Sequence, residues 1–157
     1  MARVSVSEIE SLYRARYGRF VRVATAILRD EERAVEAVQE AFASALRDRT
    51  RFRGEGPLEA WVWRIVVNAA RKEQDRMSHL PVSEEPAAED PEPPEEPVRR
   101  AVARLPERQR LALFLRYYAD LDYESIARTL DIRPGTVAAA LHAAHETLRR
   151  SLQEVPQ

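Results

Sequence analysis

Residues 121–148 read LDYESIARTLDIRPGTVAAALHAAHETL, and this stretch decides the fold of the second half of the chain. Apolar residues at steps of three and four predict a short helix with Tyr123, Ile126, Ala127 and Leu130 on one face. Asp122 can cap its start, and Asp131 tolerates the left-handed backbone that a tight turn requires. Pro134 suits the first turn of a second helix, whose apolar side carries Val137, Leu141, Ala144 and Leu148. This arrangement is typical of a helix-turn-helix, which places its second helix in the DNA major groove. A packed helical hairpin with no role in DNA binding is the alternative.

The outward side of that second helix is unusual for a helix that reads DNA. Such helices normally present Arg, Lys, Asn or Gln to bases and phosphates. Here the positions expected to face outward are Ala138, Ala139, Ala140, His142, Ala143 and His145. Positive charge is expected only at the two ends, from Arg133 before the helix and from Arg149 and Arg150 after most of it.

Composition sets the limits of the interpretation. The 157 residues permit one domain or two small ones, and 45% hydrophobic with 32% charged residues is ordinary for a globular protein. The absence of Cys excludes disulfides and thiolate metal sites and fits a reducing cytoplasm. Neither a signal sequence nor an apolar run of membrane-spanning length is expected.

The net charge of −1 conceals a division along the chain. Residues 1–78 carry 15 Lys and Arg against 12 Asp and Glu, and residues 98–157 carry 10 against 7. Residues 79–97 carry seven Asp and Glu, no Lys or Arg, and several prolines. Because proline and like charges oppose helix formation, this stretch is predicted to be an extended linker between two mildly basic helical units.

Three helices are predicted in the first unit. Ser7 and Glu10 form a capping-box pattern for a helix that runs to about Arg29, and Asp30 can cap the second helix. The third follows a turn-rich loop, residues 50–57, and its polar side carries Asn68, Arg71, Lys72 and Arg76. Trp61 and Trp63 cannot both face one core, because residues two apart diverge on a helix.

Phe52 stands between Arg51 and Arg53 in the loop before the third helix. An exposed aromatic ring between two guanidinium groups suits single-stranded nucleic acid, by stacking and by phosphate contact. A phenylalanine that fills the core is the more common arrangement, and the loop alone does not decide between the two.

Both units resemble one family when they are considered together. AVQEAF at residues 37–42 and RFRGEGPLEAWVWRIVVN at residues 51–68 resemble region 2 of extracytoplasmic-function sigma factors, the promoter-melting part of these RNA polymerase subunits. LPERQR at residues 105–110, LDYESIA at residues 121–127 and GTV at residues 135–137 resemble their region 4. The two blocks occur in the family's order and cover nearly the whole chain. The resemblance implies an all-α protein without catalytic residues or cofactors.

The resemblance also implies roles for residues of the first unit. Core polymerase would be bound by Glu36, Gln39, Glu40 and Phe42 on the second helix. The downstream (−10) promoter element would be held by the loop residues Phe52, Arg53, Gly54 and Glu55 together with Arg64, Asn68, Arg71 and Lys72 on the third helix. A base flipped out of the melted duplex can be read by an amide or a guanidinium group and stacked on an aromatic ring.

In the second unit the resemblance implies contact with the upstream (−35) element. The positions concerned are Arg133, Thr136, Ala138, Ala139, His142, Ala143, His145 and Arg149. The family usually has Lys or Arg where this chain has Ala138, Ala140 and Ala143, and often Arg in place of His145. It also usually has Gly at the position of Asp131 and Ser or Thr at that of Arg133. The fold tolerates these differences, but upstream recognition does not obviously survive them.

The sequence therefore predicts a cytoplasmic sigma factor with a region 2-like unit at residues 1–78, a linker at 79–97 and a region 4-like unit at 98–157. Its expected partners are core RNA polymerase, promoter DNA and an anti-sigma protein, with neither a membrane nor a small-molecule substrate. A sigma-like protein that binds polymerase or a regulator without reading the −35 element is the alternative. An enzyme is a third possibility with little support, since only His142 and His145, one helical turn apart, suggest a metal.

Overall fold

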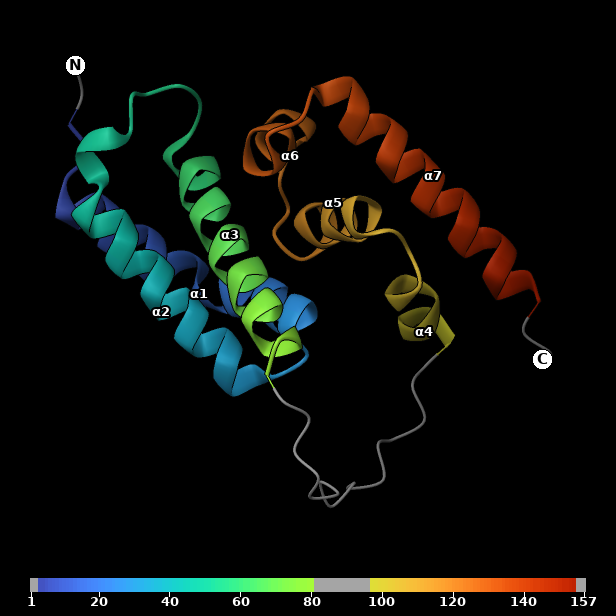
Figure 1. The fold of residues 1–157 in the computed structure, drawn as a ribbon. Helices are drawn as coiled ribbons and strands as arrows, with labels where there is room; N and C mark the ends of the chain where they lie inside the picture. Colours follow the sequence, from blue (N-terminus) through green and yellow to red (C-terminus); the bar gives the residue numbers. More distant parts are fainter. Residues whose placement is uncertain (1–2, 81–96, 155–157) are drawn as a thin grey trace.

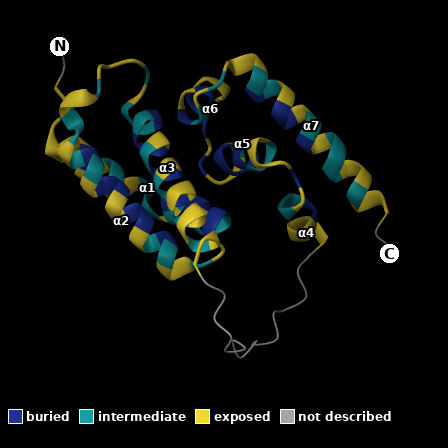
Figure 2. Ribbon diagram, viewed as in Figure 1, coloured by how far each residue is buried: buried dark blue, intermediate teal, exposed yellow. Residues whose placement is uncertain are grey.

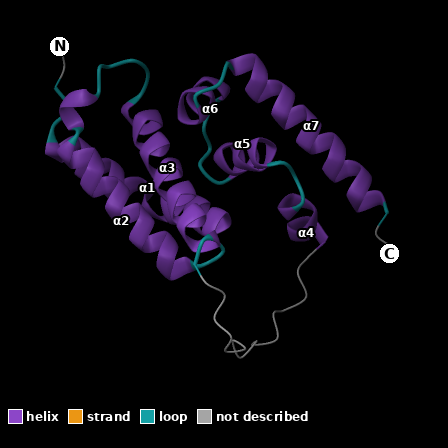
Figure 3. Cartoon of the chain, viewed as in Figure 1, coloured by secondary structure: helices purple, strands orange, loops and turns teal. Residues whose placement is uncertain are grey.

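The computed structural model describes residues 3–80 and 97–154. In these residues every regular element is a helix and none is a strand, so the predicted all-α class is confirmed (Figures 1 and 3). In chain order the elements are α1 (Val6–Leu28), α2 (Glu31–Arg47), the 3-10 turn η1 (Arg49–Arg51), α3 (Leu58–Ser78), α4 (Pro97–Ala103), α5 (Glu107–Tyr117), α6 (Tyr123–Leu130) and α7 (Pro134–Gln153). Most of the predicted linker, residues 81–96, lies outside the described residues.

The first bundle consists of α1, α2 and α3, which pack around aromatic side chains. Trp63 is fully buried, with its ring centroid 4.2 Å from that of Phe20. Phe42 joins them, at 5.1 Å from Phe20 and 4.8 Å from Tyr13. Trp61 is only half-buried, which confirms that the two tryptophans face different surroundings.

The first helix begins two residues earlier than the sequence suggested. Ser5 is the cap: its hydroxyl accepts from the Glu8 backbone at 3.1 Å, and the Glu8 carboxylate accepts from the Ser5 backbone at 2.7 Å. The predicted box of Ser7 and Glu10 is wrong, because both residues already lie within the helix, where Glu10 pairs with Arg14. The Ser-x-x-Glu pattern occurs twice here, and the outer copy adds half a turn of helix. The predicted cap of α2 is confirmed, since the Asp30 carboxylate accepts from the Arg33 backbone at 3.2 Å.

The second bundle consists of α4 to α7 and contains the predicted helix-turn-helix. The Asp122 carboxylate accepts from the Ser125 backbone at 2.8 Å, which caps α6. Asp131 has φ 56° and ψ 48°, so it supplies the left-handed residue of the turn, and Pro134 opens α7. Val137, Leu141 and Ala144 are buried against the rest of the bundle, as predicted.

The two bundles lie against each other, with α3 beside α6 and α1 beside α5 (Figure 1). The buried residues form one core cluster with members from both bundles, and exposed residues alternate with them along the helices (Figure 2). The α7 helix lies on the side of the second bundle away from α1–α3 (Figure 1). This arrangement places α3 between the core of its own bundle and the helix-turn-helix.

Candidate nucleic-acid and polymerase interface

The loop before α3 presents a short polar stretch beside an aromatic pair. Phe52 is half-buried and lies 5.5 Å from Trp61, centroid to centroid, while Arg53, Gly54 and Glu55 are exposed. Gly54 has φ 75°, a backbone conformation that residues other than glycine rarely adopt. Phe52 thus neither fills the core nor stands free, and the Phe52–Trp61 pair forms one wall of the loop.

The polar residues of α3 are divided between two adjacent stripes. Ala60, Arg64, Val67 and Arg71 recur at steps of four, three and four, so they share one side of the helix. Asn68 and Lys72 follow by one position each and lie on the next side, where both are exposed. The four residues expected to meet the −10 element therefore face two directions.

The first stripe meets the second bundle. Nη2 of Arg64 lies 3.7 Å from a carboxylate oxygen of Asp131, in the turn of the helix-turn-helix. Nε of Arg71 lies 2.7 Å from Oε1 of Glu107, at the start of α5. The sequence motifs did not indicate either pair. All four side chains are exposed to solvent.

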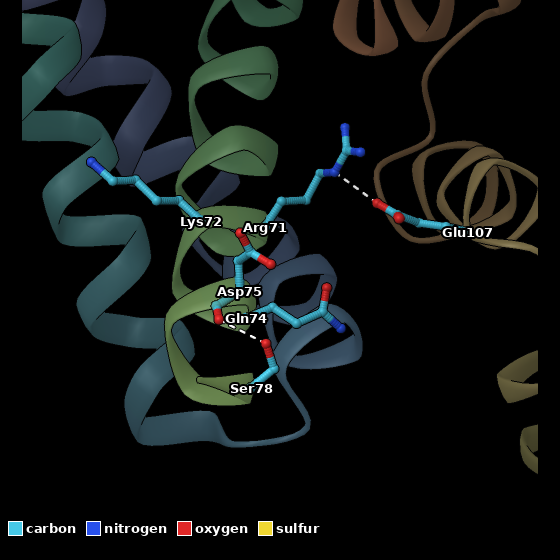
Figure 4. Close-up of a pocket in the computed structure, with 6 residues that line it drawn as sticks. All are labelled: Arg71, Lys72, Gln74, Asp75, Ser78 and Glu107. Carbon is cyan, nitrogen blue, oxygen red and sulfur yellow. Dashed lines mark hydrogen bonds and ion pairs between the residues drawn. The ribbon is translucent and has the colours of Figure 1, made fainter. Parts of the chain in front are cut away.

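Figure 4 shows the cleft beside the Arg71–Glu107 pair. It measures about 640 Å³ and is lined by Arg71, Lys72, Gln74, Asp75, Ser78 and Glu107. Arg71 reaches across it to Glu107, whereas Lys72 points away (Figure 4). Charges of both signs line the cleft, so it has no single electrostatic preference for a ligand.

Glu73 ties α3 to α2 near this cleft. Its carboxylate accepts from Arg76 at 2.7 Å and from Arg33 at 3.0 Å. The hydrogen bond from Arg76 and the positive charge of both arginines lower the pKa of Glu73 below its usual value. Arg76 near the end of α3 and Arg33 at the start of α2 are thereby engaged within the first bundle.

The outer side of α2 is acidic and polar. Glu36, Gln39 and Glu40 are exposed along it. Phe42, grouped with them by the family resemblance, is 5% exposed and lies in the core. In this conformation the buried Phe42 side chain packs α2 against α1 and is not on the surface that a polymerase would contact.

The outer side of α7 carries Ala139, His142, His145 and Arg149 as exposed residues, with Thr136, Ala138 and Ala143 half-buried and Arg133 exposed before the first turn. Ala140 is only 8% exposed, so its predicted outward position is wrong: it lies next to the Val137–Leu141–Ala144 side. Nε2 of His145 is 2.8 Å from the hydroxyl of Tyr117. In the part of the chain that the structure describes, His, Cys, Asp and Glu form no group of three that could hold a metal.

Comparison with known proteins identifies both halves. The family described as Sigma-70 region 2 matches residues 12–76, and the family described as Sigma-70, region 4 matches residues 95–148. The chain is 30% identical to the RNA polymerase sigma-H factor of Pseudomonas aeruginosa over 145 residues, covering 79% of this chain and 75% of that protein. It is 31% identical to the ECF RNA polymerase sigma-E factor of Haemophilus influenzae over 139 residues, covering 75% and 74%.

A solved structure has the same fold. The sigma factor RpoE, in complex with the anti-sigma factor NepR from Bartonella quintana, superposes with a TM-score of 0.68 at 20% identity, covering 96% of this chain and all of that one.

The chain is all-α, with a helix-turn-helix in its second half, an arrangement that is common among DNA-binding proteins. With these relatives, the chain belongs to the extracytoplasmic-function RNA polymerase sigma factors. As a sigma factor, it directs RNA polymerase to promoters. None of the described helices is long and apolar enough to cross a membrane.

Proposed function

We propose that this sigma factor reads and holds the melted −10 element with the 52–55 loop and α3, and that it docks on core polymerase through the outer side of α2. In the same proposal α7 supplies only weak contact with duplex DNA. The chain acts without catalysis of its own, in the cytoplasm, as two units, residues 1–78 and 98–157, joined by residues 79–97.

The observation that carries the reading role is the position of Asn68 and Lys72. Both are exposed on α3, on the side next to the stripe that carries Arg64 and Arg71, here called the arginine stripe. An amide can pair with the edge of an unstacked base, while Lys and Arg neutralise the phosphates beside it. The Phe52–Trp61 pair offers an aromatic wall near the start of the same helix.

The docking role of α2 rests on exposed polar side chains held by a rigid core. Glu36, Gln39 and Glu40 stand on one side of the helix, and Phe42 fixes the opposite side against Phe20 and Tyr13. A polar surface on a well-packed helix suits a basic partner surface, since little side-chain order has to be created on binding. An anti-sigma protein is a further expected partner, in line with the complex of the similarly folded RpoE.

Reconstituted transcription tests the proposal. Core polymerase, the purified chain and a library of randomised promoter sequences are combined, and the transcripts are sequenced. We expect transcripts to enrich a defined −10 sequence strongly and a −35 sequence weakly. Enrichment of the −35 sequence alone would contradict the assignment of the main reader to α3.

A Glu36→Arg/Glu40→Arg chain separates docking from reading in the same assay. We expect it to lose association with core polymerase, because the outer side of α2 changes sign. A matched chain with Glu31→Arg and Glu32→Arg, exposed at the start of the same helix, serves as the control for charge reversal. Equal loss of association in both chains would show that α2 acts through overall charge and not through the proposed surface.

A further inference from the structure

The contact between the bundles involves successive turns of the helix that is proposed to read DNA. At the start of α3, Gly56 has φ 82° and lies so close to α6 that a Cβ there would stand 2.5 Å from Nε of Arg128. One turn on, the Thr129 hydroxyl donates to the Ala60 carbonyl at 3.4 Å. Arg64 and Arg71 follow with their carboxylates from Asp131 and Glu107. The arginine stripe of α3 is thus matched along its length by one side of the second bundle.

The contact contains an apolar and small-residue centre as well as charges. Ala60 and Thr129 are 1% and 2% exposed, so water is excluded where α3 and α6 cross. A separate contact joins α1 to the segment between α5 and α6, where Nη1 of Arg19 donates to the Ala119 carbonyl at 3.4 Å. These features hold the two bundles in one defined arrangement.

The two carboxylates stand where an anionic ligand of the arginines would stand. A guanidinium group binds a carboxylate and a phosphate through the same donors. Glu107 takes Nε of Arg71 at 2.7 Å, and Asp131 takes Nη2 of Arg64 at 3.7 Å. A nucleic-acid phosphate would therefore compete with these acids for the two arginines.

We propose that the structure is a closed, self-masked state, in which Glu107 and Asp131 occupy the arginines of α3 and must be displaced before single-stranded DNA binds. This inference rests on the proposed reading role of α3. The mask is selective, since Asn68 and Lys72 on α3 and the docking residues Glu36, Gln39 and Glu40 on α2 stay exposed.

The strength of the mask suits a switch. Both arginines are about half-exposed, with side-chain exposures of 49% for Arg64 and 47% for Arg71, and Asp131 is 81% exposed. Such ion pairs contribute about 0.2–1 kcal/mol each, so a polyanion can displace the two acids from the arginines, while the buried Ala60–Thr129 contact contributes to closure separately. Apparent affinity for DNA is reduced by the fraction of chains that are closed.

The test neutralises both acids in the full chain. Glu107→Gln and Asp131→Asn keep the side-chain shapes, and Asn also tolerates the left-handed backbone at position 131. Asp120→Asn with Glu124→Gln is the matched control: both residues are exposed, Asp120 is also left-handed, and the net charge changes equally. Binding of a fluorescein-labelled pool of random single-stranded DNA is measured by anisotropy.

We expect the Glu107→Gln/Asp131→Asn chain to bind single-stranded DNA about three- to tenfold more tightly than the unsubstituted chain, which lies within the roughly two- to thirtyfold that two pairs of about 0.2–1 kcal/mol allow. The affinity of the control chain for single-stranded DNA should rise less than twofold. Equal gains in both would mean that overall charge alone is responsible, and the mask would be rejected.

A distance measurement tests the closure apart from any DNA binding. Because the chain has no Cys, Ser11→Cys on α1 and Gln153→Cys on α7 accept a pair of fluorescent or spin labels without side reactions. The distribution of distances between the two labels should be narrow in the unsubstituted chain. In the Glu107→Gln/Asp131→Asn chain it should be broader or shifted to longer distances. An unchanged distance would overturn the role of the two acids in closure.

The outcomes separate this inference from the proposed function. If the bundles open but DNA affinity stays constant, the mask is wrong, while the reading role stands or falls with the transcription experiment. If the chain fails to enrich any −10 sequence in transcription, the proposed function fails, and the mask fails with it, whatever the label distances show.

Discussion

The two helices that were expected to meet DNA, α3 and α7, are alike on their buried sides and different on their outer sides. Both bury an unbroken apolar stripe, with Val62, Trp63 and Val66 in α3 and Val137, Leu141 and Ala144 in α7. Outside, α3 carries arginines, a lysine and an asparagine, whereas α7 carries alanines and two histidines between terminal arginines. A helix can therefore keep every feature that its fold requires and still lose the side chains that its usual ligand requires.

The difference extends to what each helix faces. Two arginines of α3 form ion pairs with acids of the second bundle, whereas α7 lies on the side of that bundle away from the first (Figure 1). The helix with the side chains better suited to DNA is therefore the one that contacts the other bundle.

Loss of the buried side of α7 should have the largest effect. Leu141 is 2% exposed, so we expect Leu141→Ala to lower the free energy of unfolding by about 2–5 kcal/mol, since it leaves a cavity. Exposed His142, the next residue, is the control, and His142→Ala should change stability by less than about 0.5 kcal/mol. Urea unfolding followed by circular dichroism measures both. Similar values for the two variants would mean that α7 is not held by the side described above.

Loss of the outer side of α3 should weaken DNA binding without weakening the fold. Asn68→Ala is expected to cost about 1–3 kcal/mol in binding of the polymerase complex to a template with a pre-melted −10 region, the usual size of a base contact. Asn68 is exposed, so urea unfolding should be unaffected. If Asn68→Ala lowers affinity for core polymerase by the same amount, the residue supports docking and not reading.

Adding charge to the outer side of α7 should bring the two helices closer in behaviour. We expect Ala138→Arg with Ala143→Arg to raise affinity of the chain for duplex DNA about tenfold at low salt, and to steepen the salt dependence by about one unit per new phosphate contact. Ser11→Arg with Ala15→Arg, at exposed positions of α1, adds the same charge elsewhere. Binding titrations at several salt concentrations distinguish contact from general attraction. A gain that is equal in the two chains would show that α7 does not lie against DNA.

Sequence patterns predicted the parts of the fold that depend on neighbouring residues. Asp131 and Pro134 indicated the turn and the start of α7, and Asp122 and Asp30 indicated two helix caps. The pattern was ambiguous where it occurred twice, at Ser5 and Ser7, since either serine has a glutamate three residues later. Ala140 was misplaced because alanine occurs on both sides of α7, so the apolar periodicity blurs there.

The contacts between the bundles could not be predicted in this way. Thr129 and Ala60 are 69 residues apart in the chain, and Arg19 and Ala119 are 100 apart. Glu107 and Asp131 have plain local roles, one in the first turn of α5 and one in the turn after α6, and nothing near them in sequence points to Arg71 or Arg64. The roles assigned to Asn68, Lys72 and the α2 residues stay predictions from the family resemblance.

The smallest effect is expected at the cap of α6, a part of the second bundle that serves the fold and not DNA. The hydrogen bond from the Ser125 backbone to the Asp122 carboxylate lowers the pKa of Asp122 below its ordinary value of 3.8. A carboxylate whose pKa is lower in the folded state stabilises the fold fully above the unfolded-state value. That contribution is lost as the pH falls through the lowered folded-state pKa. Asp122→Ala should therefore lower the free energy of unfolding by about 1 kcal/mol at pH 7, the usual value of a helix cap, and by much less in strong acid.

Asp122→Asn separates the cap from its charge, because Asn also caps helices but does not titrate. This variant should keep most of the stability at pH 7 and should lack the acid-dependent part. Urea unfolding of the three chains, at pH 7 and at a pH below 3, measures the difference at each pH, and the other titrating groups cancel because they are common to all three. A deficit in Asp122→Ala that is equal at both pH values would mean that the Ser125 backbone gains nothing from the charged form. The Asp122 carboxyl group would then cap α6 equally well in its protonated and ionised forms.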